Sequence, residues 1–408
     1  MQRTNVSAPA LAATLAGLAM LGPFSVDTYL PSFPEIQREF AASPFELQQT
    51  LSVYIITFAV MTLFHGALSD SFGRRPVILV SLAAYVLASI GCVFAASFGQ
   101  MLFFRGLQGL CAGVGWVVGR AIVRDAFNDH EAQRLLSLIT MIFGIAPAVA
   151  PVIGGWLQGA FGWRSVFVFL ALYGVLQLAM CWWRLPETHP KEARQPFAAG
   201  PLLRNYRLLA GDPLLVLLSV SIAFNFAGMF LYVASAPAII YGLFDLDENG
   251  FPVLFVPSIA GIMIGAFLSG RMAGRVPRLL TVRVGFIVMF FAAAFNVGYH
   301  ALHPAALPWT VLAVMLYSVG MALAGPSVQL MVLDLHPGLR GTASSLQGFT
   351  HSLFTALAAG LVSPLVSGSG LTLAAAQAAL VTGGCACWVL YLRAARKARA
   401  RPGGITAA

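Results

Sequence analysis

Charged residues are scarce in this chain, at 10% of its 408 residues, whereas hydrophobic residues make up 59%. Soluble domains carry about 25% charged residues, so the composition excludes an ordinary soluble protein. The mean hydropathy of +0.82 indicates an integral membrane protein. Its apolar runs are continuous over about 20 residues, as membrane helices require, and do not alternate over about 10 residues as barrel strands do. The expected fold class is therefore all-α.

Patterns for catalysis and for metal or cofactor binding are also missing. The chain has no nucleophile–base pair, phosphate-binding glycine loop or zinc cluster, so it predicts no enzyme, no cofactor and no metal site. Its five cysteines all lie in apolar runs and are expected to be small buried hydrophobic residues, not a disulfide framework. The net charge is +9, but the basic residues stand singly at the ends of apolar runs, without an aromatic-interleaved patch. No nucleic-acid partner is expected.

Twelve apolar runs are long enough to cross a membrane. The first extends to Val26 without a convincing cleavage site, so a retained helix is expected in place of a signal peptide. Pro31 and Pro34 then mark the end or a kink of this helix before a polar loop. The further spans are predicted at residues 47–67, 77–96, 101–121, 135–159, 164–184, 213–241, 251–270, 279–300, 307–333, 341–366 and 371–392.

The loop cations favour one orientation of these spans. Loops assigned to the outside hold only Arg38 and Arg164, while the other loop cations collect on the opposite side together with both termini. Lysine and arginine are enriched in cytoplasmic loops. We therefore expect a multi-pass protein of the cell inner (cytoplasmic) membrane with both termini in the cytoplasm.

An internal repeat indicates two related halves. The segment GALSDSFGRRPVIL at 66–79 returns in weaker form 200 residues later, where Gly270 stands in place of Asp70. A proline-rich, charged segment near the middle of the chain separates six spans from six, as in transporters built from paired bundles. The expected domains are an N-terminal six-helix bundle (1–184), a central cytoplasmic linker (185–212) and a C-terminal six-helix bundle with a basic cytoplasmic tail (213–408).

Two charges are predicted to lie within the hydrocarbon. Asp27 lies near the outer end of the first span and Arg105 just inside the outer end of the fourth, so their depths are similar. A charge at the bilayer centre costs about 2.5–3.5 kcal/mol on insertion scales, so each needs a partner or water. One reading pairs the two residues, directly or through water. In the other, headgroups wet Asp27, and Arg105 bonds backbone carbonyls and braces the bundle.

The fifth span contains Pro147, Pro151, Gly154 and Gly155. Proline in a helix interior costs about 3 kcal/mol unless a kink is accommodated. Two interpretations stay open: a bent, closely packed helix at the pivot between conformations, or an ordinary structural kink.

Most aromatic and amide side chains within the spans are expected to pack against neighbouring helices. A subset that faces a central cavity would suit a lipophilic, polyaromatic ligand, because adaptable apolar walls with few polar anchors tolerate varied shapes. The candidate substrate residues are Tyr29, Tyr54, Gln108, Met141, Asn225, Phe226, Tyr232, Tyr317, Gln347 and His351.

Several motifs resemble those of the major facilitator superfamily. RGLQG at 105–109 looks like its proton-coupling motif, and 151–155 resembles its antiporter motif with Ala150 where glycine is usual. The segments 27–31 (DTYLP), 185–188 (LPET) and 341–348 (GTASSLQG) are similar to the Bcr/CflA-type branch of proton-driven multidrug exporters. The family's cytoplasmic loop motif is matched, with Ser71 in place of a basic residue, at Gly66, Leu68, Asp70, Gly73, Arg74 and Arg75.

This resemblance implies the major facilitator fold and a monomeric, proton-driven antiporter that exports small lipophilic drugs or toxic metabolites by alternating access. Its partners would be the substrate, protons and membrane lipid. The antiporter-like fifth span and the scarcity of polar groups favour export. The alternative is a proton-coupled uptake permease for a small nutrient such as a sugar or organic anion.

The resemblance and the charges together assign roles. Asp27 is expected to exchange a proton for the drug with Arg105 as its neighbour, because intramembrane charges occur only in the first half. Asp70 is expected to act as a latch that accepts bonds from helix-terminal amides or pairs with a cation such as Arg124 in one conformation. The expected gating residues are Gly66, Asp70, Gly73, Arg74, Arg75, Arg124, Pro151, Gly154 and Gly155.

Overall fold

The computed structural model describes residues 8–127, 129–194 and 197–399, in two compact units, Met1–Ala199 and Gly200–Ala408. Among the described residues, twelve helical segments are long and apolar enough to cross a membrane, six in each unit. The predicted all-helical fold and the number of spans are confirmed. Residues 1–7 and 400–408, which the charge pattern assigns to the cytoplasm, lie outside the described residues.

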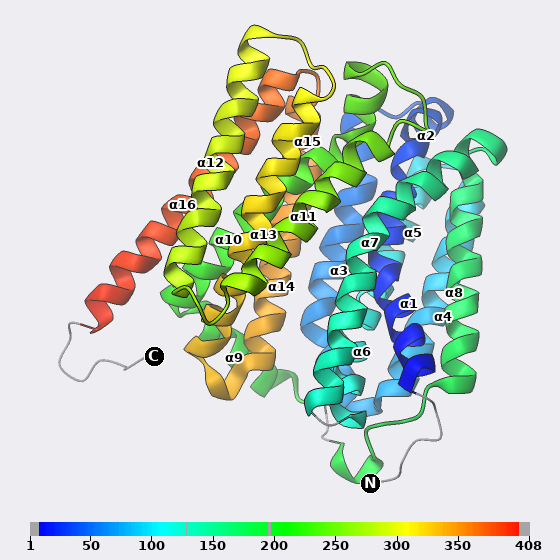
Figure 1. The fold of residues 1–408 in the computed structure, drawn as a ribbon. Helices are drawn as coiled ribbons and strands as arrows, with labels where there is room; N and C mark the ends of the chain where they lie inside the picture. The colour runs from blue at the N-terminus through cyan, green and yellow to red at the C-terminus, as the bar shows by residue number, and fades with distance from the viewer. Residues whose placement is uncertain (1–7, 128, 195–196, 400–408) are drawn as a thin grey trace. The chain divides into compact units, whose positions relative to one another are not determined.

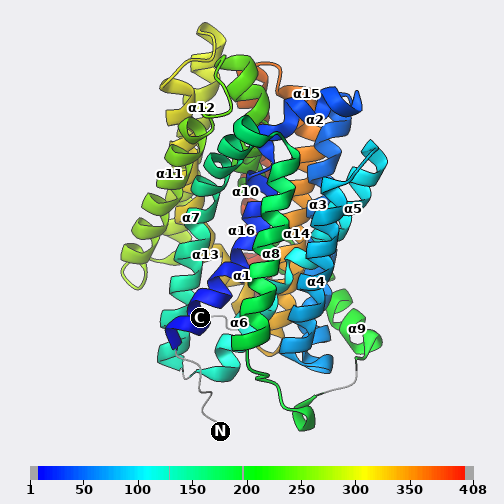
Figure 2. The same ribbon diagram turned by 90° about the vertical axis from the view of Figure 1, so that its right-hand side faces the viewer.

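The long helices of unit 1 run alongside one another (Figures 1 and 2). The first is largely buried because it packs against four others of the same unit, α5, α6, α7 and α8. The elements are α1 (Ala8–Asp27), η1 (Leu30–Ser32), α2 (Phe33–Phe40), α3 (Pro44–Phe72), α4 (Arg74–Val93), α5 (Phe98–Ala112), α6 (Val114–Ala126), α7 (Asp129–Phe161), α8 (Arg164–Arg184) and η2 (Lys191–Ala193).

The prediction of a polar loop after the first span is wrong. The chain continues instead as η1 and the short helix α2, with Pro31 and Pro34 in their first turns, where proline is tolerated. Phe33 and Ile36 are buried, one turn apart on one face of α2. The prolines therefore start helices here.

The turn between the second and third spans is shorter than the predicted charged loop. Helix α3 runs through Phe72 and α4 begins at Arg74, so only Gly73 separates them. Its φ of +101° lies in a region that glycine adopts without a Cβ penalty. Asp70 consequently lies on the last turn of α3, and Arg74 and Arg75 open α4.

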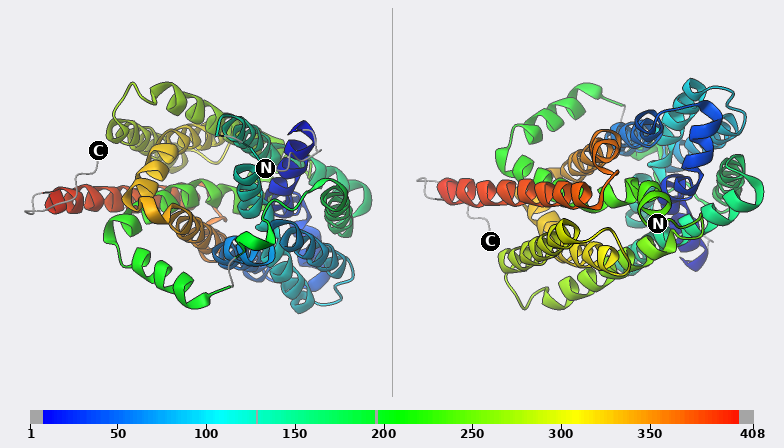
Figure 3. Two further views of the ribbon diagram at one scale, coloured as in Figure 1. Left: turned by 90° about the horizontal axis from the view of Figure 1, so that it is seen from below. Right: turned by 90° about the horizontal axis from the view of Figure 1, so that it is seen from above.

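Unit 2 is a second bundle, in which α13 packs against α11 and α12, and α10 packs against α16 (Figure 3). Its core includes Phe286, Met289, Tyr317 and Trp388. The span predicted at 213–241 ends earlier, at Ala234, and a π-helical turn follows Pro237. The elements are α9 (Ala199–Ala210, which begins at the last residue of unit 1), α10 (Pro213–Ala234), η3 (Ala238–Leu243), α11 (Pro252–Met272), α12 (Arg278–Leu302), α13 (Trp309–Leu335), η4 (Pro337–Leu339), α14 (Arg340–Leu357), η5 (Ala358–Val362), α15 (Ser363–Val366) and α16 (Gly370–Arg399).

Candidate functional site

Arg105 is completely buried in the middle of α5, inside unit 1. Its Nη1 donates hydrogen bonds to the Ser25 carbonyl oxygen at 3.0 Å and to Gln108 Oε1 at 2.9 Å. The guanidinium carbon lies 4.8 Å from the ring centroid of Tyr29 and 4.5 Å from that of Tyr54. Two aromatic faces and two oxygens thus offset part of the cost of burying this charge. Cation–π contacts are stronger where water is excluded.

Asp27, the last residue of α1, has only 4% of its surface exposed. Within the described chain, no ion pair within 4.0 Å joins its carboxylate to a cation. The direct Asp27–Arg105 pair is therefore absent, because the guanidinium bonds the Ser25 carbonyl two residues earlier on the same helix. This arrangement matches the alternative in which Arg105 bonds backbone and braces the bundle.

Helix α7 approaches the chain directly after Asp27. A Cβ added at Gly154 would collide with the backbone carbonyl of Thr28, so only glycine permits this contact. Pro147 and Pro151 both lie inside α7, which stays helical throughout. The predicted antiporter-like motif therefore contacts the segment that carries the buried carboxylate.

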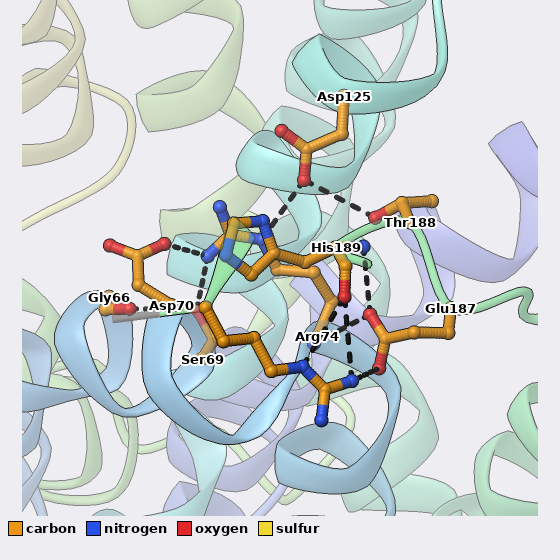
Figure 4. A network of polar contacts seen from close by, with 9 residues as sticks. Gly66, Ser69, Asp70, Arg74, Asp125, Glu187, Thr188 and His189 are labelled. Carbon is orange, nitrogen blue, oxygen red and sulfur yellow. Dashed lines mark hydrogen bonds and ion pairs between the residues drawn. The ribbon is translucent and has the colours of Figure 1, made fainter. Parts of the chain in front are cut away.

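A second cluster surrounds the turn at Gly73 (Figure 4). The Arg74 side chain is only 8% exposed and pairs with Asp70, four residues earlier, and with Asp125 at 3.0 Å. Its Nη1 also donates to Ser69 Oγ at 2.6 Å. Arg124, proposed from the sequence as the partner of Asp70, is exposed on the last turn of α6. Asp70 pairs with Arg74 because the two lie one turn apart across a one-residue break.

The segment after α8 completes this cluster. Gly73 precedes α4 and has no side chain to cap it, and Glu187 Oε1 accepts the Arg74 backbone N–H at 3.0 Å instead. The other carboxylate oxygen, Oε2, pairs with Arg194 at 3.2 Å, and Thr188 donates to Asp125 at 3.3 Å. A carboxylate is favourable at a helix N-terminus because the first N–H groups lack partners. The linker is therefore fastened to the turn.

The remaining gating candidates border this cluster or α7. Arg75 donates to the Trp182 carbonyl oxygen at 2.6 Å. The Gly66 carbonyl accepts from Ser69 Oγ at 2.8 Å. Gly155 is buried in α7 beside Gly154.

The candidate substrate residues of unit 1 have different surroundings. Tyr29 and Gln108 are fully buried and Tyr54 is 2% exposed, and all three contact Arg105. Tyr29 also exchanges a 2.8 Å hydrogen bond with Thr50. Met141 on α7 is 56% exposed. The first three thus form the shell of the buried cation.

In unit 2, Tyr232 accepts a hydrogen bond from Asn296 at 2.6 Å, and Tyr317 donates to the Asn225 backbone carbonyl at 3.0 Å. Both tyrosines are buried between helices. Phe226 on α10 lies against His351 on α14, with ring centroids 4.1 Å apart. Gln347, one turn before His351, is buried, and neither of its amide atoms has a hydrogen-bond partner in the described structure.

Sequence reasoning did not single out two buried or bonded polar residues of unit 1. His65 is 1% exposed in α3, next to Gly66, and its two ring nitrogens lack partners within the described residues. Its presence inside an apolar run was the signal that could have identified it. Glu187 belongs to the LPET segment at 185–188, but that motif did not indicate its contact with Arg74, which spans 113 residues. Across the described residues, no three His, Cys, Asp or Glu side chains gather to hold a metal ion.

Comparisons with known proteins agree with this architecture. The family model of the Major Facilitator Superfamily matches residues 15–359. The bicyclomycin resistance protein homolog of Haemophilus influenzae is 30% identical over 365 residues, covering 86% of this chain and 88% of the relative. Multidrug resistance protein D of Escherichia coli is 27% identical over 351 residues, covering 84% and 86%. The crystal structure of the human organic anion transporter MFSD10 (TETRAN) superposes with a TM-score of 0.68 at 18% identity, covering 95% of this chain and 99% of that one.

Proposed function

Because this chain belongs to the major facilitator superfamily and is a multi-pass membrane transporter, not an enzyme, we propose that it exports small lipophilic compounds in exchange for protons. The observation that carries the proposal is Asp27, a buried carboxyl without a paired cation, two residues from the carbonyl that holds Arg105. The names of the bacterial relatives, bicyclomycin resistance and multidrug resistance, support drugs as the substrate class.

Proton exchange at Asp27 follows from the cost of burying charge. An isolated ion is far more expensive to bury than a neutral carboxyl, so the ionised form needs a compensating charge nearby. A lipophilic cation that approaches Asp27 supplies that charge and favours release of the proton. Protonation in turn weakens binding of the cation, because coupling between two ligands is reciprocal.

Arg105 has a supporting role in this scheme. Its charge is fixed by the Ser25 carbonyl and Gln108 and is flanked by Tyr29 and Tyr54. It acts on Asp27 through the end of α1, as a positioning residue and not as an ion-pair partner. The substrate contacts proposed outside this shell are Met141, Asn225, Phe226, Tyr232, Tyr317, Gln347 and His351.

The Arg74 cluster is the proposed gate. Arg74 joins α3, α6 and the linker through Asp70, Asp125 and Glu187, so its contacts form or break together when these elements shift. Pro147, Pro151, Gly154 and Gly155 on α7 belong to the same alternating-access machinery. We place the cluster, with both termini, on the cytoplasmic side of an inner membrane, because the loop cations collect there. The transporter is proposed to act as a monomer.

The competing function is proton-coupled uptake of a small nutrient. Export is favoured because two relatives, from Haemophilus influenzae and Escherichia coli, are named resistance proteins. Everted membrane vesicles energised to an acidic interior separate the two. An exporter accumulates a lipophilic cation such as ethidium inside and releases protons from the vesicles when the cation is added. If vesicles preloaded with a sugar or organic anion lose the proton gradient, and lipophilic cations added outside have no effect on it, uptake is the function.

A further inference from the structure

We propose that a groove between α4 and α8 binds an anionic glycerophospholipid, with an acyl chain in the groove and the headgroup at Arg75 and Arg184. This site is separate from Asp27 and Arg105 and goes beyond the proposed transport function. It does not depend on the identity of the exported compound.

The groove is apolar and has the size of a ligand site. It is an open groove with a volume of about 480 Å³, within the roughly 300–1,000 Å³ typical of small-molecule sites. Small side chains from both helices, Ala83 and Ala179, contribute to its lining and leave room between larger neighbours. The other lining residues are Leu79, Val80, Val175, Leu178, Trp182 and Trp183.

The position of the groove favours lipid as the occupant. Val80 is 71% exposed and Trp183 is 80% exposed, and both lie on helices long and apolar enough to span the membrane. Trp182 and Trp183 stand at the end of α8, where tryptophan marks the boundary between acyl chains and headgroups. An acyl chain in the groove would thus extend from the headgroup level into the hydrocarbon.

Two cations define the chemistry at this end of the groove. Arg75 Nη2 donates to the Trp182 carbonyl oxygen at 2.6 Å, and the guanidinium carbon lies 5.7 Å from the Trp182 ring centroid. Its Nε is buried and has no hydrogen-bond partner in the described chain. Arg184 is exposed at the last residue of α8. No described carboxylate forms an ion pair with either residue, so an anionic headgroup complements both charges, which a neutral lipid does not.

Native mass spectrometry of the purified full-length transporter tests this site. Phosphatidylglycerol and phosphatidylcholine with identical acyl chains are titrated in separate experiments, and the affinity of the first bound lipid is compared. The test variants are Arg75→Gln/Arg184→Gln, which removes the charges, and Ala83→Trp, which fills the groove. The matched controls are Arg204→Gln/Arg207→Gln, which removes two exposed charges on α9, and Leu87→Trp, which places the same side chain one turn along α4 outside the groove.

The parent and both controls should prefer phosphatidylglycerol. Each cation near an anionic headgroup contributes about fivefold to binding, so the double variant should lose about twenty-five-fold in affinity for that lipid. Ala83→Trp should remove the tightest phosphatidylglycerol site while Leu87→Trp keeps it. Ala179→Leu provides a smaller groove-filling change if Ala83→Trp does not purify as a monodisperse protein. Equal affinity for the two lipids, or an unchanged preference in the double variant, would overturn the proposal.

Discussion

Glu187 should control how firmly the linker is held to the turn between α3 and α4. Its carboxylate accepts the backbone N–H of Arg74 at 3.0 Å and of His189 at 2.9 Å, and it pairs with Arg194. Hydrogen bonds to charged groups contribute about 1.5–3 kcal/mol each. The Glu187 side chain is 27% exposed, so water screens the ion pair, whose share is at most about 1 kcal/mol. His189 and Arg194 both lie in the linker, so of these contacts only the bond to the Arg74 N–H joins the linker to the turn. We therefore expect Glu187→Ala to lower the free energy of opening this segment by about 1.5–3 kcal/mol, the contribution of that one bond.

Hydrogen–deuterium exchange measures that free energy directly. A loss of this size corresponds to exchange about ten- to a hundredfold faster in peptides that cover residues 185–194 and the first turn of α4. Glu192→Ala is the matched control, because Glu192 is exposed in the adjacent η2 and its removal should leave these rates unchanged. If Glu187→Ala exchanges at the parent rate in both peptides, the linker is not fastened by this carboxylate and the description of the cluster is wrong.

Three further predictions concern the gate, α7 and the buried cation. Asp125→Asn should slow transport in proteoliposomes more than Asp70→Asn, because the Asp125 side chain is 25% exposed against 54% for Asp70; parent rates in both variants at equal expression would refute the latch. Gly154→Val should destabilise the purified protein by about 1–3 kcal/mol through overpacking, whereas Gly144→Val, where a Cβ meets nothing within 4 Å, should leave the melting temperature nearly unchanged. Arg105→Lys should lower the melting temperature by several degrees although the charge is kept, because an ammonium cannot reproduce a planar fork held between two rings; an unchanged melting curve and transport rate would contradict that packing role.

Local pattern was enough to predict the spans but not the contacts of their polar residues. Long apolar runs and one-sided loop cations report directly on the membrane, and the part of the chain that the structure describes has the expected number of spans, twelve. The sequence does not predict helix α2, because Pro31 and Pro34 indicate the end or a kink of the first span, whereas both lie in the first turns of the helices that follow it. Proline is compatible both with the end of one helix and with the first turn of the next. The burial of Phe33 and Ile36 on one face of α2 shows that a helix starts here.

For the site residues, too, the sequence indicates which residues are unusual but not what they contact. Arg105 stands out in the sequence as a cation within an apolar run, but its acceptor, the Ser25 carbonyl, is 80 residues away. Every residue has a backbone carbonyl, so the sequence does not indicate that Arg105 bonds one. Only the structure distinguishes this role from an ion pair with Asp27. Glu187 lies in the LPET segment at 185–188, which separates it from Glu192. That motif does not predict its contact with the Arg74 backbone N–H, 113 residues away.

Proton release on substrate binding tests the central claim most directly. Purified parent protein in a weakly buffered detergent solution, with a pH indicator, should release protons when a saturating lipophilic cation such as tetraphenylphosphonium is added. Asp27→Asn should still bind the cation, as followed by tryptophan fluorescence, but should release none. Asp245→Asn, which removes an exposed carboxyl between α10 and α11, should behave as the parent. Proton release that persists in Asp27→Asn would contradict the account and place the proton elsewhere, with His351 and Asp334 the next residues to replace.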